Sequence, residues 1–270
     1  MPYSSLHGCA ASWRIIWMVK ELFSVHKLSK IFPNGNPGIR ELSLSIFEGE
    51  CLLITGSNGS GKTLLMRMLL GLVEPTEGEI QFRGMPLYRA IDTLRREVGM
   101  VFQDADAQII GETLEEDVAF GPKNLGFPQE TVKTQVQAAL TATGLIEKRQ
   151  FPPRRLSGGE KRRLAVAGIL AMGGKALILD EPFANLDWPG VVQVLDSIRR
   201  LKTEGKTLVI LTHELEKVLA LADRLIILHK GMIREAGDPQ AILDRLDPAY
   251  GVRDPRRTYA QVRDCTWLTA

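Results

Sequence analysis

Cysteine is scarce in this 270-residue chain, and Cys9, Cys51 and Cys265 lie far apart. Such spacing supplies neither a disulfide framework nor a cluster of thiolate metal ligands, and it suits a reducing cytosol. An excess of charge is also missing, because 34 lysines and arginines nearly balance 32 aspartates and glutamates, for a formal net charge of +2. Charge alone therefore gives no support for nucleic acid or an acidic surface as a partner.

Long apolar runs are missing as well. The longest are short stretches such as ALIL at 176–179, whereas a membrane-spanning helix needs about 20 apolar residues. The apolar stretch at 9–19 contains Arg14 and follows no basic residue, so it makes a poor signal peptide. We expect residues 1–17 to be a disordered extension and residues 241–270 to be a short C-terminal tail.

Between these ends, short runs rich in leucine, isoleucine and valine predict strands at 50–56, 97–103, 175–180, 207–213 and 224–231. Several of these runs are apolar at successive positions, as expected for strands that helices cover on both faces. Intervening helical patterns predict an α/β fold with a mainly parallel core sheet. The segments at 22–32, 40–50 and 78–87 alternate more and carry turn residues, so we expect an antiparallel β layer beside that sheet.

The pattern changes between about 104 and 170. Residues 131–145 and 160–172 have helical periodicity, and no run between them predicts a strand. We therefore expect one domain at 18–240 whose α/β core carries an inserted helical subdomain at about 104–170.

The segment GSNGSGKT at 56–63 matches the phosphate-loop pattern G-x-x-x-x-G-K-[ST], and it lies between a predicted strand and a predicted helix. Glycines let backbone N–H groups converge on phosphates, Lys62 adds a cation, and the Thr63 hydroxyl can ligate Mg²⁺. A Gly/Ser turn that merely precedes a lysine is the alternative, but the strand–loop–helix context opposes it. The predicted nucleotide-binding residues are Gly56, Ser57, Asn58, Gly59, Ser60, Gly61, Lys62 and Thr63.

Acidic residues follow the predicted strand ALILD. Asp180 ends this strand, at the edge where α/β sheets bind ligands. Its carboxylate can hold Mg²⁺ through water, and the Glu181 carboxylate can polarise a water that attacks a γ-phosphate. His213 and Gln103 end other predicted strands at the same edge, where each is compatible with a structural role or with contact to phosphate or metal.

A second glycine turn occurs in LSGGEKRR at 156–163. Ser157 and Glu160 have the spacing of a capping box, which predicts a helix that begins near Gly158. The free N–H groups at such a helix end also attract phosphate. Because the turn has no phosphate-loop lysine and follows no strand, we expect it only to contact a phosphate that is already held elsewhere.

In chain order, GSNGSGKT, Gln103, LSGGEKRR, ALILDEP, ANLD and His213 resemble the nucleotide-binding subunit of ATP-binding cassette (ABC) transporters, over about residues 20–240. The resemblance implies the P-loop NTPase fold of that family and a site shared between two cassettes. In such a site Ser157, Gly158, Gly159 and Glu160 of one cassette close over ATP on the phosphate loop of the other.

The same resemblance assigns further roles. Phe32 is expected to stack on adenine, Asp187 to link the two sites across the dimer, and His213 to act as a switch histidine. The expected catalytic residues are Glu181, His213, Lys62 and Gln103. The expected Mg²⁺ ligands are Thr63, Gln103 and Asp180.

The segment FQDADAQIIGETLEEDVAFGPKNLG at 102–126 resembles the energy-coupling-factor ATPases of cobalt, nickel and vitamin uptake. In that group this region docks a helix of the membrane subunit. Acidic residues lie beside Ile109 and Ile110, both of which we expect to be exposed. This arrangement suits a basic coupling helix as well as it suits a solvated acidic face. These acidic residues are Glu112, Glu115, Glu116 and Asp117.

We therefore expect an ATP-hydrolysing peripheral subunit at the cytoplasmic face of the cell membrane, with ATP and Mg²⁺ as ligands. Its expected partners are a second identical or homologous cassette and integral membrane transport subunits, with no nucleic acid. The expected cargo is a transition metal ion such as cobalt or nickel, or a vitamin. The alternatives are the ATPase of an ordinary two-permease importer, a regulatory ATP-binding module that meets no membrane, and a nucleic-acid-associated cassette.

Overall fold

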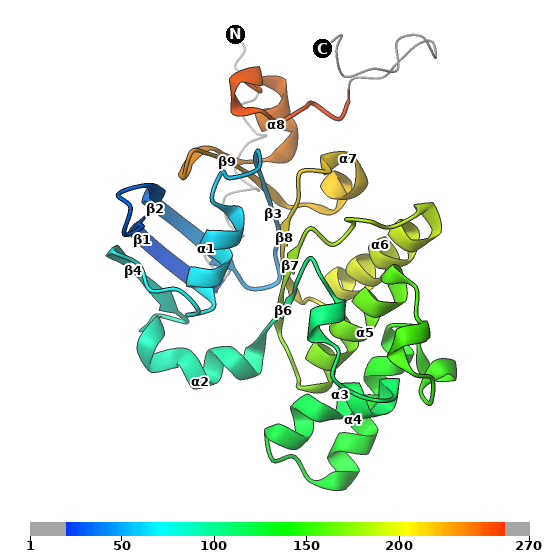
Figure 1. The fold of residues 1–270 in the computed structure, drawn as a ribbon. Helices are drawn as coiled ribbons and strands as arrows, with labels where there is room; N and C mark the ends of the chain where they lie inside the picture. Colours follow the sequence, from blue (N-terminus) through cyan, green and yellow to red (C-terminus); the bar gives the residue numbers. More distant parts are fainter. Residues whose placement is uncertain (1–19, 257–270) are drawn as a thin grey trace, which may run out of the picture.

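The computed structural model describes residues 20–256, so the predicted extension at 1–17 and the end of the predicted tail lie outside the described residues. A central sheet has the strand order β10-β9-β3-β8-β7-β6 (Figure 1). The strands from β9 to β6 pair in parallel, and β10 pairs antiparallel with β9. The predicted mainly parallel core sheet is confirmed. Its strands are β3 (Cys51–Thr55), β6 (Val98–Val101), β7 (Ala176–Asp180), β8 (Thr207–Leu211), β9 (Arg224–His229) and β10 (Met232–Gly237).

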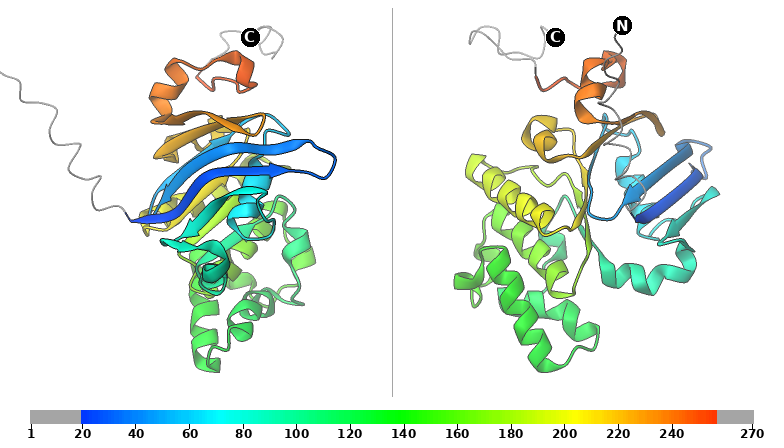
Figure 2. Two further views of the ribbon diagram at one scale, coloured as in Figure 1. Left: turned by 90° about the vertical axis from the view of Figure 1, so that its left-hand side faces the viewer. Right: turned by 180° about the vertical axis from the view of Figure 1, so that it is seen from behind.

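A second, antiparallel sheet has the strand order β2-β1-β4-β5 and confirms the predicted β layer. Its strands are β1 (Glu21–Ile31), β2 (Pro37–Phe47), β4 (Glu77–Phe82) and β5 (Met85–Pro86). Helices α1 (Lys62–Leu69) and α2 (Leu87–Glu97) lie on the same side of the central sheet as this layer (Figures 1 and 2).

The remaining longer helices lie on the opposite side of the central sheet, which the view from behind shows as well (Figure 2). They are α3 (Leu114–Asn124), α4 (Gln129–Ala142), α5 (Gly158–Ala171) and α6 (Trp188–Thr203). The short α7 (Leu215–Val218) and α8 (Pro239–Asp244) follow. The predicted boundary at 240 therefore falls inside α8, whose Ile242 and Leu243 are buried.

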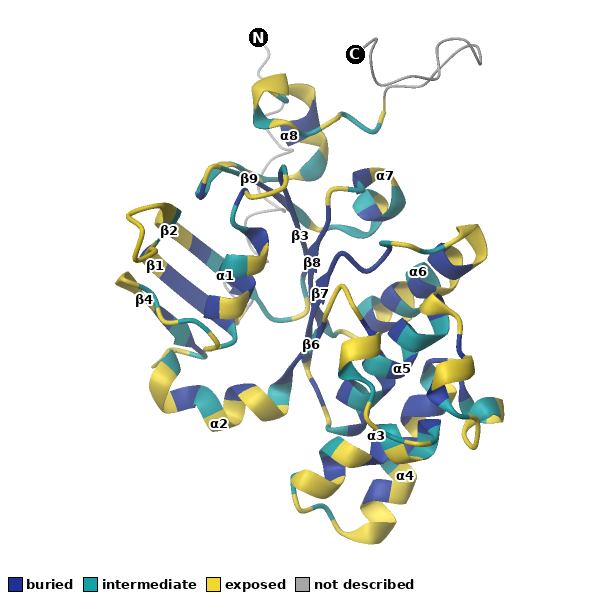
Figure 3. Cartoon of the chain, viewed as in Figure 1, coloured by how far each residue is buried: buried dark blue, intermediate teal, exposed yellow. Residues whose placement is uncertain are grey.

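Three apolar cores result from this layering (Figure 3). Leu52 and Ile54 of β3 belong to the core between the two sheets, whereas Leu53 belongs to the core under α6. The apolar residues at successive positions of β3 are thus buried on both faces, as predicted. A third core joins α3, α4 and α5, and no described residue between 104 and 170 lies in a strand.

Two predicted strands are shorter in the structure than the sequence suggested. Gln103 and His213 lie two residues beyond the ends of β6 and β8. The chain leaves the sheet there because side chains replace strand partners: the Phe102 N–H donates to Gln108 Oε1 (2.8 Å), and the His213 N–H donates to Glu181 Oε2 (3.4 Å).

The contact between β6 and α5 generates a stability prediction. A Cβ atom at Gly99 would lie 2.2 Å from Ile169 Cγ2 and 2.5 Å from Cγ1, so Gly99→Ala should lower the free energy of unfolding by about 1–3 kcal/mol through overpacking. Gly168→Ala in the same helix is the control, because a Cβ there meets nothing within 4 Å. That control should gain up to about 1 kcal/mol from helix propensity. Urea unfolding followed by circular dichroism compares the two, and equal effects would contradict the packing argument.

Candidate functional site

The phosphate loop connects β3 to α1 in a conformation that requires glycine. Gly56 has φ +153°, and a Cβ atom there would lie 2.1 Å from the Leu228 carbonyl oxygen and 2.7 Å from Ser60 Oγ. Gly61, with φ +107°, immediately precedes α1, which begins at Lys62. The unpaired N–H groups of the first turn therefore face the loop, in the arrangement that binds phosphate.

Lys62 lies inside this loop. Its Nζ donates to the carbonyl oxygens of Gly56 (2.7 Å) and Ser57 (3.3 Å), and the residue is 8% exposed. Burial lowers the pKa of the ammonium group, whereas the nearby Glu181 and Asp180 carboxylates raise it. The cation bonds only backbone carbonyls here, so a phosphate that enters the loop can take over those bonds.

Thr63 and Asp180 are 117 residues apart in sequence, yet Thr63 Oγ1 donates to Asp180 Oδ2 over 3.3 Å. Burial raises the pKa of the Asp180 carboxyl, and the bond from Thr63 acts in the opposite direction. A hydroxyl and a carboxylate in contact are hard oxygen donors of the kind that Mg²⁺ prefers, with room left for water and phosphate oxygens. This pair therefore fits the predicted metal role.

Glu181 and His213, predicted separately, are in direct contact. His213 Nδ1 donates to Glu181 Oε1 over 2.9 Å, while Thr212 Oγ1 donates to Oε2 over 2.9 Å. The Glu181 N–H donates to the Leu211 carbonyl oxygen (2.8 Å), so its backbone is attached to the end of β8. Its φ of +46° lies in the left-handed region, which is a strained conformation often found at functional sites.

Phe32 and Gln103 are placed less directly. The Phe32 ring borders α1, because a Cβ atom at Gly38 would meet both Phe32 Cε2 (2.8 Å) and Leu64 Cδ2 (2.4 Å). It is 41% exposed, as a platform for a planar base requires. Gln103 is exposed, and within residues 20–256 its side chain makes no hydrogen bond to Thr63 or Asp180. The expected metal role of Gln103 stays a prediction.

The second glycine turn forms the predicted cap. The Glu160 N–H donates to Ser157 Oγ (3.3 Å), and the Ser157 N–H donates to Glu160 Oε2 (2.9 Å). Gly158 and Gly159 lie against the segment that carries Asp187, whose side chain caps α6 by accepting from the Gly190 N–H (3.0 Å). This turn begins α5, on the other side of the central sheet from α1 (Figure 1), so one chain does not bring its two glycine turns together.

Sequence reasoning missed two buried polar residues, Thr212 and Arg162. Arg162 is 6% exposed, and its Nη2 donates to the carbonyl oxygens of Gln103 (3.2 Å) and Ala184 (2.6 Å). Burial lowers the pKa of its guanidinium group. In the sequence, its burial is indicated by its spacing from Val166 and Ile169, which places Arg162 on the buried face of α5. The position of Thr212, between a predicted buried strand and His213, could have indicated that it lies beside the site.

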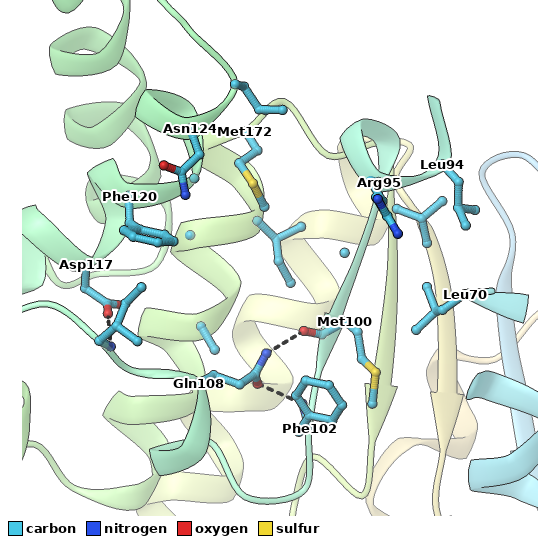
Figure 4. Close-up of a pocket in the computed structure, with 18 of the residues that line it drawn as sticks. Leu70, Leu94, Arg95, Met100, Phe102, Gln108, Asp117, Phe120, Asn124 and Met172 are labelled. Carbon is cyan, nitrogen blue, oxygen red and sulfur yellow. Dashed lines mark hydrogen bonds between the residues drawn. The ribbon is translucent and has the colours of Figure 1, made fainter. Parts of the chain in front are cut away.

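A groove with a volume of about 490 Å³ lies between β6 and the helices α3 and α5 (Figure 4). Several large apolar side chains on its walls are exposed, namely Leu72 (60%), Phe102 (37%), Ile110 (59%) and Phe120 (50%). The Gln108 amide holds the wall in shape, because it donates to the Met100 carbonyl oxygen (2.9 Å) and accepts from the Phe102 N–H.

The predicted acidic patch at this groove needs correction. Ile109 is half-buried against the core of α3 and α4, so only Ile110 of the pair is exposed. Asp117 accepts from the backbone N–H groups of Ile110 (2.8 Å) and Gly111 (2.9 Å), and Glu115 accepts from Gln150. The carboxylates of Asp117 and Glu115 therefore bond groups of the same chain. Of the four acidic residues, Glu112 and Glu116 are the exposed ones.

None of the helices within residues 20–256 combines the length and the apolar character that crossing a membrane requires.

Comparison with known proteins relates this geometry to a family. The family model for ABC transporters matches residues 39–184. An ABC transporter ATP-binding protein of Halobacterium salinarum is 45% identical over 79% of this chain and 92% of its own length. The cobalt import ATP-binding protein CbiO of Rhodobacter capsulatus is 40% identical over 85% of this chain and 84% of its own. Against two longer relatives, the chain spans 56% and 53% of their length.

Among solved structures, CbiO1 of Clostridium perfringens, described as part of the ABC transporter complex cbiONQ, superposes with a TM-score of 0.78. It is 32% identical, and the match covers 83% of this chain and 91% of CbiO1. The two chains therefore share the same overall fold. The chain belongs to the ABC transporter family, as an ATP-binding subunit with ATPase activity.

Proposed function

We propose that this ATPase powers the import of a small solute through an energy-coupling-factor transporter. The observation that carries the proposal is the apolar groove, because its α3 wall is formed by EEDVAFGPKNLG at 115–126, the sequence that resembles this transporter class. The name of one relative, a cobalt import ATP-binding protein, supports a transition metal ion as cargo. Nickel and a vitamin are the other candidates that the sequence resemblance suggests.

The active unit in this proposal is a pair of cassettes, formed with an identical or a homologous chain. Helix α1, which follows the phosphate loop, and helix α5, which follows the turn at Ser157, lie on opposite sides of the central sheet, so a second copy is needed to place one glycine turn against the other. Ser157, Gly158, Gly159 and Glu160 then contact the γ-phosphate of ATP held by the partner cassette, and Asp187 lies between the two sites. Contacts to a γ-phosphate exist only before hydrolysis, so ATP favours closure and its hydrolysis permits reopening.

Each chain contributes a complete set of groups for binding the nucleotide. The loop residues 56–63 surround the phosphates, Lys62 exchanges its carbonyl partners for phosphate oxygens, and Phe32 stacks on the base. Thr63 and Asp180 would hold Mg²⁺, with Gln103 joining them after a movement of its loop. Bound there, Mg²⁺ would supply charge neutralisation at the phosphates.

Hydrolysis then depends on Glu181. Water attacks the γ-phosphorus while the bond to the leaving ADP oxygen breaks, and the Glu181 carboxylate accepts the proton that this water loses. His213 turns from Glu181 toward the γ-phosphate, which its exposed side chain permits. The products are ADP and phosphate. Most of the rate acceleration comes from positioning and from cations near the transferred group.

The groove in this proposal receives an amphipathic helix of an integral membrane subunit, which keeps the chain at the cytoplasmic face of the membrane. Apolar side chains such as Phe120 and Ile110 supply the buried contacts, and Arg95 with Asn124 supplies the polar rim. Affinity purification of the chain from native membranes in mild detergent tests the class. A broad transmembrane subunit with a small substrate-binding membrane protein is expected, whereas paired permeases with a soluble binding protein would contradict it.

The groove assignment predicts the effect of a charged side chain on its wall. Phe120→Asp should abolish co-purification of the membrane subunit, because a carboxylate would be desolvated in the apolar contact. ATP binding should remain unchanged, since Phe120 does not contact the phosphate loop. Phe151→Asp is the matched control, with a similarly exposed ring (45%) outside the groove. Loss of the membrane subunit from both variants, or from neither, would contradict the assignment.

The role of Glu181 predicts a separation of binding from turnover. Glu181→Gln should lower kcat by at least about 100-fold, because an amide is no base, while ATP affinity stays within about twofold. With ATP and Mg²⁺, the variant should accumulate as a dimer in size-exclusion chromatography. Glu216→Gln, an exposed neighbour of the same chemistry, should behave like the wild type. Rapid turnover by Glu181→Gln would overturn the role.

The position of Lys62 in the phosphate loop predicts that its removal weakens the binding of ATP. Lys62→Ala should weaken ATP binding by about 10- to 100-fold, the usual value of a charge-assisted hydrogen bond to phosphate. Isothermal titration calorimetry measures the change. Lys175→Ala provides the control, because Lys175 pairs with Glu97 just before β7, at the opposite edge of the sheet. Unchanged affinity in the Lys62 variant would count against phosphate binding by this loop.

A further inference from the structure

Thr212 is the least exposed polar residue next to the hydrolytic groups, at 0%. Its backbone N–H donates to the Ile54 carbonyl oxygen (3.1 Å), which attaches it to β3. Its hydroxyl accepts from the Glu214 N–H (3.1 Å) and donates to Glu181 Oε2 (2.9 Å). A hydroxyl has a single proton to donate, so in this structure that proton is committed to Glu181.

The two oxygens of Glu181 have different partners. Oε2 accepts from Thr212, and more distantly from the His213 N–H (3.4 Å), and both donors are fixed by the backbone at the end of β8. Oε1 accepts from the His213 ring at 2.9 Å. The His213 side chain is 54% exposed, whereas that of Glu181 is 10% exposed. One partner of the carboxylate is therefore free to leave, and the other is not.

We propose that Thr212 is a positioning residue for ATP hydrolysis, which holds the Glu181 carboxylate through Oε2 while Oε1 exchanges His213 for the attacking water. The inference rests on the proposed role of Glu181. A glutamate side chain has three rotatable bonds. Without the Thr212 hydroxyl, departure of the His213 ring would leave the carboxylate only the longer bond from the His213 N–H (3.4 Å), and it could rotate away from the water. The buried hydroxyl prevents that rotation, and misplacement of a reacting group by about 1 Å can cost about 100-fold in rate.

Two other roles for Thr212 make different predictions. In a purely local role, its hydroxyl would only accept from the Glu214 N–H and support the turn after β8, as threonine often does. In an inhibitory role, its bond would hold Glu181 away from the nucleotide. Loss of the hydroxyl would then leave kcat unchanged or raise it, whereas the positioning role requires kcat to fall.

The test compares Thr212→Val, which keeps the shape and removes the hydroxyl, with Thr212→Ser, which keeps the hydroxyl and removes a methyl group. Thr212→Val should lower kcat by about tenfold, the value of one hydrogen bond. KM for ATP and the dissociation constant measured by calorimetry should stay within about twofold, because Thr212 touches no nucleotide-binding residue. Thr212→Ser should keep at least about half of the wild-type kcat.

Thermal unfolding of both variants separates positioning from packing. If kcat follows the melting temperature rather than the presence of a hydroxyl, so that both variants lose activity in proportion to stability, the positioning role is overturned. A wild-type or raised kcat in Thr212→Val overturns it as well. Should Thr212→Val fail to fold, Thr212→Cys replaces it, because its thiol has the shape of serine and is a weak donor.

A double variant separates this inference from the proposed function. In a Glu181→Gln background, Thr212→Val should lower kcat no further, because the base that Thr212 positions is already gone. An additional tenfold loss there would show that Thr212 acts elsewhere and would overturn the inference. Rapid turnover by Glu181→Gln alone would instead overturn the proposed role of Glu181. An inactive Glu181→Gln with a fully active Thr212→Val would leave the proposed function intact and remove Thr212 from it.

Discussion

Parallel pairing of β3 with β8, and of β8 with β7, is the constraint on which the candidate site depends. In parallel strands all carboxyl ends meet at one edge, so the phosphate loop after β3, Asp180 at the end of β7 and Thr212 after β8 become neighbours. None of these groups is close to the others in sequence. A one-residue slip of β7 against β8 would turn Asp180 into the core and bury an unpaired carboxylate. The pairing that buries the apolar residues of β7 is therefore the same pairing that places Asp180 at the site.

Much of this arrangement could be predicted because it follows from strong local patterns. Strands such as β3 are apolar at successive positions, which only burial on both faces explains, and the phosphate loop has a spacing that its backbone geometry demands. Ser157 and Glu160 likewise form the capping box that their spacing predicts. Each of these features is decided within about ten residues of sequence, where the physical requirement is visible.

The features that could not be predicted depend on contacts between distant segments. Gln103 was predicted to end a strand, but the Phe102 N–H bonds the Gln108 side chain, and β6 already ends at Val101. Ile109 and Ile110 look alike in sequence, yet only one faces the groove, because Asp117 fixes the loop between them and α3. The contact between Glu181 and His213 required the register of β7 against β8, which no local pattern specifies.

Arg162 shows how the groove and the acidic edge share one structural element. A guanidinium buried beside carbonyl oxygens carries a desolvation cost that Asp104 and Glu214 offset only at a distance. Its planar group holds the Gln103 carbonyl, beside the groove residue Phe102, and the Ala184 carbonyl, three residues after Glu181, on the same nitrogen. Both carbonyls bond one nitrogen of a buried side chain, so the loop beside the groove and the segment that follows Glu181 are attached to the same residue of α5.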